Sequence, residues 1–220
     1  MHRCWILGQD AKEENKYVQK IHPLPEELIA VSDFVADEFF KNFLVRPRYI
    51  IPNGIDKNLI DDNLPGRAIH VIGVGSLIPL KQYEVFIQCI AELKKNIPHI
   101  TSMIAGKGME RQFLQEQIMR LDLGDNVTLV GEKEHVEVLQ LMQQTKVFLH
   151  PSSYEGFSMV CQEALYAGCH VISFCKPMNV DFKHWHIVKT KEEMVAKGLE
   201  ILLQTGLEHQ AVMTYPIDET

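Results

Sequence analysis

The sequence has few cysteines, and their arrangement excludes a disulfide framework or a zinc knuckle. The five cysteines are odd in number, and no two of them have C-x-x-C spacing. Unpaired thiols of this kind are typical of the reducing cytosol, so we expect a cytoplasmic protein. The cysteines are Cys4, Cys89, Cys161, Cys169 and Cys175.

Long apolar runs are also absent. The short apolar patch from Cys4 to Leu7 is too short for the core of a signal peptide. No run approaches the roughly eighteen apolar residues that a membrane-spanning helix needs. The sequence therefore predicts a soluble chain. An enzyme that contacts a membrane surface through another part of the protein is still compatible with this pattern.

Charge of one sign is not concentrated anywhere in the chain. The net charge is −7, and no block of five or more like charges occurs. The sequence thus lacks the basic footprint of a nucleic-acid-binding protein, and any site for an anion has to be built locally. With 46% hydrophobic and 23% charged residues, the composition is that of a globular protein.

From residue 69 onward, short apolar runs alternate with amphipathic helical runs. This alternation predicts an α/β fold with a mostly parallel, Rossmann-like sheet and helices on both faces. The runs are almost continuously apolar, as expected for strands that are covered on both sides. The predicted strands are Ile69 to Gly75, Ile100 to Ala105, Val127 to Val130, Val147 to His150 and Val171 to Phe174, with a short sixth at His186 to Val188.

The segments around the strands also follow helical spacing. A buried stripe of Tyr83, Phe86, Ile87, Ile90 and Leu93 predicts the first helix, and later runs predict helices at Phe113 to Leu121, Val136 to Met142 and Thr190 to Leu203. A short βαβ unit is predicted from residue 28 to residue 51. Residues 1–25 are polar and cannot be placed in a core, and residues 206–220 are expected to form a loosely held tail.

The most informative stretch runs from Pro151 to Gly168. It follows a predicted strand, turns at Glu155 and Gly156 and enters a helix, so it lies at the carboxyl end of a parallel strand. Open α/β sheets bind ligands at these ends. The first backbone N–H groups of such a helix lack intrahelical partners and attract phosphate. Here they belong to Gly156, Phe157, Ser158, Met159 and Val160.

Two glutamates flank this predicted anion site: Glu155 in the turn and Glu163 within the first two turns of the helix. A carboxylate repels a bare phosphate but accepts hydrogen bonds from paired sugar hydroxyls. A sugar joined to a nucleoside phosphate has both features. Each glutamate alone would be interpreted as a surface or helix-dipole charge, but together they favour a nucleotide-sugar site.

The stretch from Glu155 to Gly168 resembles the signature of glycosyltransferase family 4. Seven residues separate Glu155 from Glu163, with Gly156-Phe157 after the first glutamate and Ala164-Leu165 after the second. Further segments resemble the family in the same order: 31–34, 51–56, 74–81, 105–108 and 127–131. The similarity covers about residues 28–203. It implies a GT-B fold of two Rossmann-like domains, of which residues 28–205 would be the carboxyl-terminal, donor-binding domain.

The resemblance implies a role for individual residues. Lys81 would contact the donor diphosphate, Glu155 the hydroxyls of the donor sugar and Glu163 those of the ribose. Lys81 and Glu155 would act in catalysis, and backbone amides from Gly156 to Val160 would complete the phosphate cradle. The family's phosphate-binding turn and base-binding loop correspond to Gly75, Ser76 and Gly131.

The implied reaction is the retaining transfer of a sugar from a nucleoside diphosphate sugar, with UDP as the expected nucleotide, to an acceptor hydroxyl. The acceptor would be a glycan or a lipid-linked sugar. Neither a metal nor another cofactor is expected, and nucleic acid is not an expected partner. A lone lysine before a helix is otherwise interpreted as a solvated surface charge.

The chain departs from the family pattern at several positions. Ser76 stands where the family usually has an arginine, and Ser158 where a glycine is common. A glycine-rich turn with a glutamate is replaced by the segment 175–179. The acceptor domain that a GT-B enzyme needs has no room before residue 28. We therefore interpret residues 1–27 as its remnant or linker, with the acceptor domain missing or on another chain.

Other interpretations are weaker. A nucleotide-sugar-binding module without its own catalysis is the main alternative, and a sugar-nucleotide epimerase or a phosphorylase is a third. Gly73-Val74-Gly75 lacks the full dinucleotide fingerprint, and Gly106-Lys107-Gly108 lacks the serine or threonine of a P-loop. His184 and His186 have no third ligand at zinc spacing and are interpreted as a surface pair.

Overall fold

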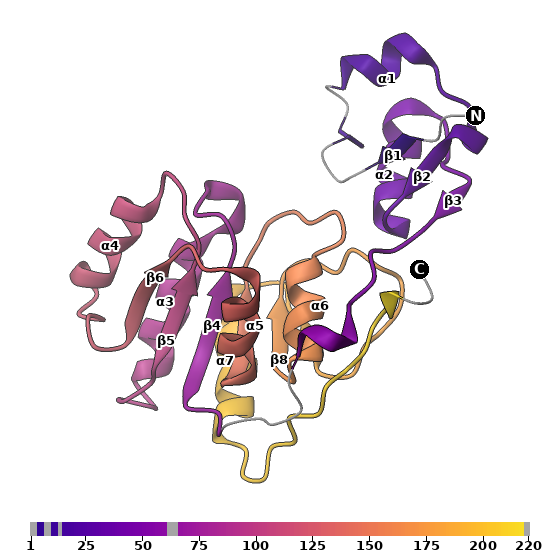
Figure 1. The fold of residues 1–220 in the computed structure, drawn as a ribbon. Coiled ribbons are helices and arrows are strands. Elements are labelled where there is room, and N and C mark those ends of the chain that lie inside the picture. Colours follow the sequence, from indigo (N-terminus) through magenta and orange to yellow (C-terminus); the bar gives the residue numbers. More distant parts are fainter. Residues whose placement is uncertain (1–3, 7–9, 13–14, 61–65, 218–220) are drawn as a thin grey trace.

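The computed structural model describes residues 4–6, 10–12, 15–60 and 66–217, and its main body is a parallel sheet of six strands. The strand order is β6-β5-β4-β7-β8-β9 (Figure 1). This confirms the predicted α/β fold. The strands are β4 (Ile69–Val74), β5 (Ser102–Ala105), β6 (Val127–Gly131), β7 (Thr145–His150), β8 (His170–Ser173) and β9 (Trp185–Ile187).

Helices cover both faces of this sheet. On one face α3 (Tyr83–Lys94), α4 (Arg111–Arg120) and α7 (Lys191–Leu203) enclose a core with Val71, Val147 and Ile172. On the other, α5 (His135–Gln143) and α6 (Met159–Tyr166) pack on Ile72, Phe148 and Val171. Successive residues of one strand thus pack into the cores on opposite faces of the sheet. Because both faces are buried, the strands are continuous apolar runs in the sequence.

The predicted helices are present, but the buried side of α4 differs from the expectation. Leu114 and Ile118 enter the core, whereas Phe113 and Met119 are 39% and 64% exposed. None of the helices in the described ranges combines the length and the apolar character that a bilayer crossing requires.

The first 50 residues contribute a second, smaller sheet, in which β1 (Cys4–Ile6), β2 (Leu28–Ala30) and β3 (Tyr49–Ile50) run parallel. The 3-10 turn Pro25–Glu27 and the helices α1 (Lys16–Ile21) and α2 (Asp33–Phe43) complete this N-terminal unit. Residues before position 28 do enter a core, contrary to the expectation from their polar composition. Ile6 and Ala11 are buried together with Val35 and Phe39 of α2. The proposed remnant also includes residues 1–3, 7–9 and 13–14, which lie outside the described part of the chain.

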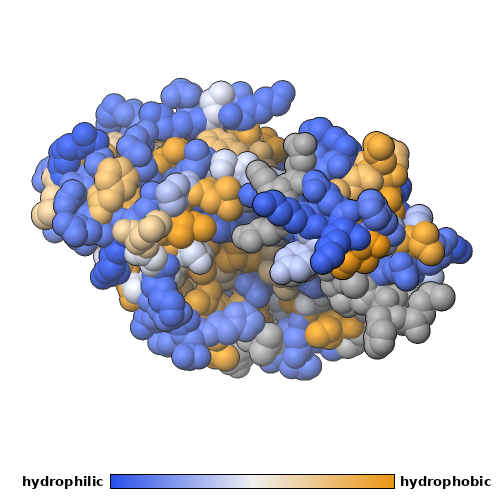
Figure 2. Space-filling view, turned by 90° about the horizontal axis from the view of Figure 1, so that it is seen from above, coloured by the Kyte–Doolittle hydropathy of each residue, from blue (hydrophilic) through white to orange (hydrophobic). Residues whose placement is uncertain are grey.

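The N-terminal unit also exposes large apolar side chains. Tyr17, Ile21 and Leu44 are between 68% and 81% exposed on α1 and at the end of α2. Figure 2 views the molecule from this side and shows hydrophobic patches among the hydrophilic surface. Large apolar side chains of the N-terminal unit are therefore accessible to solvent.

The C-terminal segment is held against the main body rather than loosely attached. The backbone N–H of Ile55 donates to Tyr215 (2.7 Å), and that of Val212 donates to Leu165 (3.0 Å). The hydroxyl of Thr214 donates to the side chain of Gln162 (2.6 Å). The expected tail therefore differs from the structure over residues 206–217, and residues 218–220 lie outside the described chain.

Backbone hydrogen bonds join the turns after β4, β5 and β6. Gly75 N–H donates to Ala105 (3.0 Å), Leu77 N–H to Lys107 (2.8 Å) and Gly106 N–H to Gly131 (2.8 Å). The turns approach so closely that a Cβ on Gly106 would lie 1.9 Å from the carbonyl oxygen of Gly75. The Gly-x-Gly turn is therefore required by the packing of backbone on backbone.

We expect Gly106→Ala to destabilise the protein by about 3 kcal/mol or more, because the methyl group meets backbone and the φ of +149° strains an L residue. Gly124→Ala is the matched control, since a Cβ there meets nothing within 4 Å. Urea unfolding of both variants measures the difference. Equal stability of the two variants would contradict the close approach of the turns.

Three histidines gather around His170 at the amino end of β8. Its ring centroid lies 4.2 Å from that of His184, 5.8 Å from that of His186 and 5.6 Å from that of His209. The predicted surface pair is thus half-buried in a cluster. Burial and neighbouring positive charges lower the pKa values of His186 and His209 to about 4. Among the described residues, no group of three or more potential ligands has the geometry to hold a metal ion.

This cluster predicts a loss of stability in mild acid. The unfolded chain binds protons below the ordinary histidine pKa of about 6.5, whereas the folded rings resist them until about pH 4. The free energy of unfolding should therefore fall by about 1 kcal/mol between about pH 7 and pH 5, with allowance for solvent screening.

His186→Phe keeps the stacked ring and removes one titrating group, so this difference should shrink. The control, His99→Gln, changes an exposed histidine outside the cluster and should leave the difference intact. Urea unfolding at the two pH values tests both variants, and the same pH dependence in His186→Phe and wild type would refute the role of the cluster.

Candidate active site

The candidate site lies where the sheet reverses its strand order, at the carboxyl ends of β4 and β7. After β4 the chain continues to one side of the sheet, and after β7 to the other, which opens a crevice between the two loops. The 3-10 turn η3 (Pro79–Lys81) follows β4, and the loop from Pro151 to Ser158 follows β7. The N–H of Ser153 donates to the carbonyl of Leu80 (3.0 Å) and so fixes one loop to the other.

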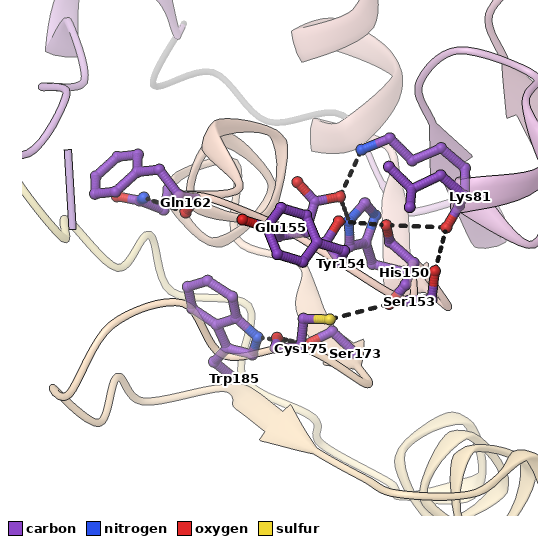
Figure 3. A network of polar contacts seen from close by, with 12 residues as sticks. Lys81, His150, Ser153, Tyr154, Glu155, Gln162, Ser173, Cys175 and Trp185 are labelled. Carbon is purple, nitrogen blue, oxygen red and sulfur yellow. Dashed lines mark hydrogen bonds and ion pairs between the residues drawn. The ribbon is translucent and has the colours of Figure 1, made fainter. Parts of the chain in front are cut away.

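Lys81 and Glu155, both predicted from the sequence, meet directly in this crevice. The Nζ of Lys81 lies 2.5 Å from Oε1 of Glu155, and the side chains are only 18% and 11% exposed. Nε2 of His150, the last residue of β7, lies 2.7 Å from the same oxygen. Figure 3 shows the carboxylate between the lysine and the imidazole. Two donors, one from the turn after β4 and one from the end of β7, therefore hold a single carboxylate.

The electrostatics keep Glu155 ionised. Its burial alone would raise the pKa, but the hydrogen bond and charge of His150 and the charge of Lys81 outweigh burial and lower the pKa to about 2. An ionised carboxylate can only accept hydrogen bonds, so Nε2 of His150 donates in this contact. Both contacts use Oε1, and no described residue donates a hydrogen bond to Oε2. In Figure 3 this second oxygen points away from Lys81 and His150.

Helix α6 begins directly after this loop and presents free backbone donors. Within the described chain, no hydrogen bond uses the backbone N–H groups of residues 156–160. Ser158 occupies the N-cap position in the left-handed region, with a φ of 58°, and its side chain does not cap the helix. The free amides and the helix dipole together favour an anion at this end of α6.

Glu163 lies on α6 beside a different hollow. Its Oε1 is 2.8 Å from Nε2 of His135, the first residue of α5. The hollow offers about 500 Å3 of space that is partly open to solvent, and it is also lined by Met159, Tyr166 and Asp56. The structure thus places Glu163 among α5, α6 and the segment around Asp56, whereas Glu155 faces Lys81.

The remaining predicted site residues either line a hollow or pack in a core. Gly75 and Ser76 line a third hollow of about 450 Å3 with Lys107 and Glu132, the residue after Gly131. Phe157 is 5% exposed and packs in the core of the N-terminal unit, so only its backbone is available to a ligand. Val160 packs at the edge of the core between α5 and α6.

The N-terminal unit reaches the site through the same loop. The hydroxyl of Ser32, the residue that caps α2, donates to the carbonyl of Gly156 (2.6 Å). The rings of Phe34 and Tyr154 lie edge to face at 5.5 Å. The loop that carries Glu155 is therefore held from both sides.

Two residues of the site were not predicted from the sequence. His150 is the last residue of an apolar strand and His135 is the first residue of a helix. Neither has a neighbour in the sequence that would indicate its partner. The available signal for His150 was its place at the carboxyl end of a parallel strand, one residue before the loop. For His135 no comparable signal exists.

Comparison with known proteins identifies the family. Residues 55–216 match the family model described as "Glycosyl transferases group 1". The chain is 28% identical over 203 residues to the GtfA subunit of a UDP-N-acetylglucosamine--peptide N-acetylglucosaminyltransferase from Streptococcus pneumoniae. This match covers 86% of the chain and 40% of the relative, so the chain spans well under half of that protein's length.

Solved structures share the fold. A TarM structure from S. aureus, in complex with fondaparinux, alpha-GlcNAc-glycerol and UDP, gives a TM-score of 0.76 at 18% identity. The match covers 89% of this chain and 41% of that one. A structure of a GtfA/B complex gives a TM-score of 0.65 at 19% identity, covering 82% of this chain and 39% of that one.

The left-handed conformation of Ser158 predicts that Ser158→Gly stabilises the protein. The left-handed conformation costs a residue with a Cβ about 1–2 kcal/mol, and glycine avoids this cost. Glycine also makes the unfolded chain more flexible, which offsets part of the gain in stability. We expect a gain of about 0.5–1 kcal/mol in urea unfolding. Ser153→Gly, in the same loop at a negative φ, should give no gain. A stabilised Ser153→Gly or a destabilised Ser158→Gly would contradict the conformational explanation.

Proposed function

The chain belongs to the group 1 glycosyl transferases, and on this premise we propose that it binds the nucleoside diphosphate sugar donor of a retaining, family 4 type sugar transfer. The observation that carries the proposal is the junction of Lys81, Glu155 and the free amides of α6 at the strand switch point. A cation, an oriented carboxylate and a helix N-terminus together match a ligand that combines phosphates with sugar hydroxyls.

Lys81 and the amides of residues 156–160 stabilise the diphosphate as it leaves the sugar. Negative charge grows on the leaving oxygen in the transition state, and fixed donors in a partly buried crevice offset it. In this proposal the positive charge comes from the lysine and the helix rather than from a metal ion. Lysine suits the role because its flexible stem lets the ammonium follow the phosphate.

Glu155 and Glu163 orient the two hydroxyl-bearing ends of the donor. The free Oε2 of Glu155 accepts from the hydroxyls of the donor sugar, while His150 holds Oε1 in place. Glu163 accepts from the ribose, and His135 steadies its carboxylate. Both glutamates act by positioning, so neither has to attack the sugar.

Donor binding exchanges one ion pair for another. Lys81 leaves Glu155 and turns to the diphosphate. The largely buried carboxylate of Glu155 then loses one of its two partners. An unpaired buried charge is strongly destabilising. The contact with His150 at 2.7 Å compensates Glu155 during this exchange. This contact supports the assignment of Glu155 to the sugar hydroxyls, which the resemblance to glycosyltransferase family 4 implies.

The relatives suggest the donor and the setting. The name of the streptococcal relative contains UDP-N-acetylglucosamine, so a UDP sugar of this class is the first donor to test. The acceptor is a glycan or a lipid-linked sugar in this proposal. An acceptor domain, in a further part of the protein or on another chain, packs on the exposed apolar side chains of the N-terminal unit. The reaction takes place in the cytoplasm.

A donor-binding module without its own catalysis is the second candidate. Ser76 lines the hollow beside Gly75 and Lys107. The family usually has a cationic residue at this position, so the uncharged serine weakens the stabilisation of a leaving diphosphate. The similarity to a two-protein GtfA/B complex supports a function that needs a partner chain. Hydrolysis of a UDP sugar by the chain alone would refute this alternative.

Calorimetry with UDP and GDP tests the proposed site. Lys81→Ala should weaken UDP binding about 10- to 100-fold, because a charge-assisted contact to phosphate is worth about 1.5–3 kcal/mol. Glu163→Ala should weaken it about ten-fold through the ribose. Lys95→Ala is the control, since Lys95 is exposed at the far end of α3 and pairs with Glu92.

Equal UDP binding by wild type, Lys81→Ala and Glu163→Ala would rule out the proposed site. Thermal unfolding of each variant checks that the fold is retained. If Lys95→Ala lost as much UDP affinity as Lys81→Ala, the effect would come from net charge alone and not from the site.

A further inference from the structure

Tyr83 is a buried residue of the site that the proposed function has not yet used. It is the first residue of α3 and is 1% exposed. Its ring packs against the strand before the phosphate turn, where a Cβ on Gly73 would lie 3.0 Å from Cε1. The ring of Phe86 packs edge to face with it, with ring centroids 6.4 Å apart, and approaches Gly73 as well. The ring therefore has a fixed position.

The hydroxyl of this ring reaches the turn between β4 and Lys81. A Cβ built on Gly75 would lie 3.0 Å from Oη of Tyr83 and 3.7 Å from Cε of Lys81. Burial raises the pKa of Tyr83, and the charge of Glu155 raises it further. The hydroxyl thus stands beside the stem of Lys81 and within the field of Glu155, and it keeps its proton at neutral pH.

This hydroxyl makes no hydrogen bond within the described residues. A buried polar group without a partner costs about 1–3 kcal/mol, whereas phenylalanine would fill the same space without that cost. The position of the hydroxyl is nevertheless specific, because Gly75 leaves it room and lines the hollow that holds Ser76. A ligand in the site would supply the partner that the protein does not.

We propose that the hydroxyl of Tyr83 donates a hydrogen bond to a phosphate oxygen of the nucleoside diphosphate. The inference rests on the proposed donor site and adds a residue that distinguishes a diphosphate from a bare nucleoside. In the ligand-free structure the hydroxyl is buried near the stem of Lys81 and within the field of Glu155. When Lys81 turns toward the phosphate, the hydroxyl is uncovered and meets the strongest acceptor in the site.

Tyr83→Phe tests the proposal with UDP and uridine as probes. UDP binding, measured by calorimetry, should weaken about ten-fold because one hydrogen bond to a charged group is lost. Uridine binding, measured by NMR titration, should not change, and the ligand-free melting temperature should stay the same or rise. The 31P chemical shift of bound UDP should move in the variant. The control Tyr17→Phe changes a tyrosine that is 79% exposed and should alter none of these.

Unchanged UDP affinity in Tyr83→Phe would overturn the proposal while leaving the donor site intact. Equal weakening of UDP and uridine would also overturn it, because it would show a general distortion of the site. Failure of the wild-type chain to bind UDP would instead overturn the proposed function, and this inference with it.

Discussion

The adjacency of β4 and β7 at the centre of the sheet is the constraint on which the site depends. Residues 81 and 155 are 74 positions apart, yet they follow strands that lie side by side. The hydrogen bond from Ser153 to Leu80 ties the two loops together, and the close approach of Gly75 and Gly106 fixes the turn beneath them. Without this strand order, the lysine, the glutamate and the helix N-terminus would have no reason to meet.

Compensation of the Glu155 charge is the second feature that defines this crevice. Burial disfavours the ionised form of Glu155, and two donors on one oxygen reverse the effect. Because Lys81 comes from the turn after β4 and His150 from the end of β7, the carboxylate would keep a partner if the lysine moved to a ligand, as we propose. The crevice is thus polar and partly dry, and its fixed groups interact more strongly than they would in water.

Much of this arrangement is predictable from the sequence, because the signals are local. Continuous apolar runs gave the six strands, and the turn at Glu155 and Gly156 marked the start of a helix. The contact of Lys81 with Glu155 is not local, so the sequence suggested a shared ligand and not a direct ion pair. The core around Ile6 and Ala11 was missed because these residues pack on α2, beyond a polar segment. His150 and Tyr83 looked like ordinary strand and helix residues.

The bond between the Ser32 hydroxyl and the Gly156 carbonyl joins the two sheets at the peptide that opens the anion-binding segment. A rotation of the small sheet against the large one would pull on this peptide and re-aim the amide of Phe157. If the crevice binds the proposed donor, its occupancy and the orientation of the small sheet would then be linked, and thermodynamic reciprocity would require each to bias the other. A single hydroxyl thereby connects the N-terminal unit to the loop that carries Glu155.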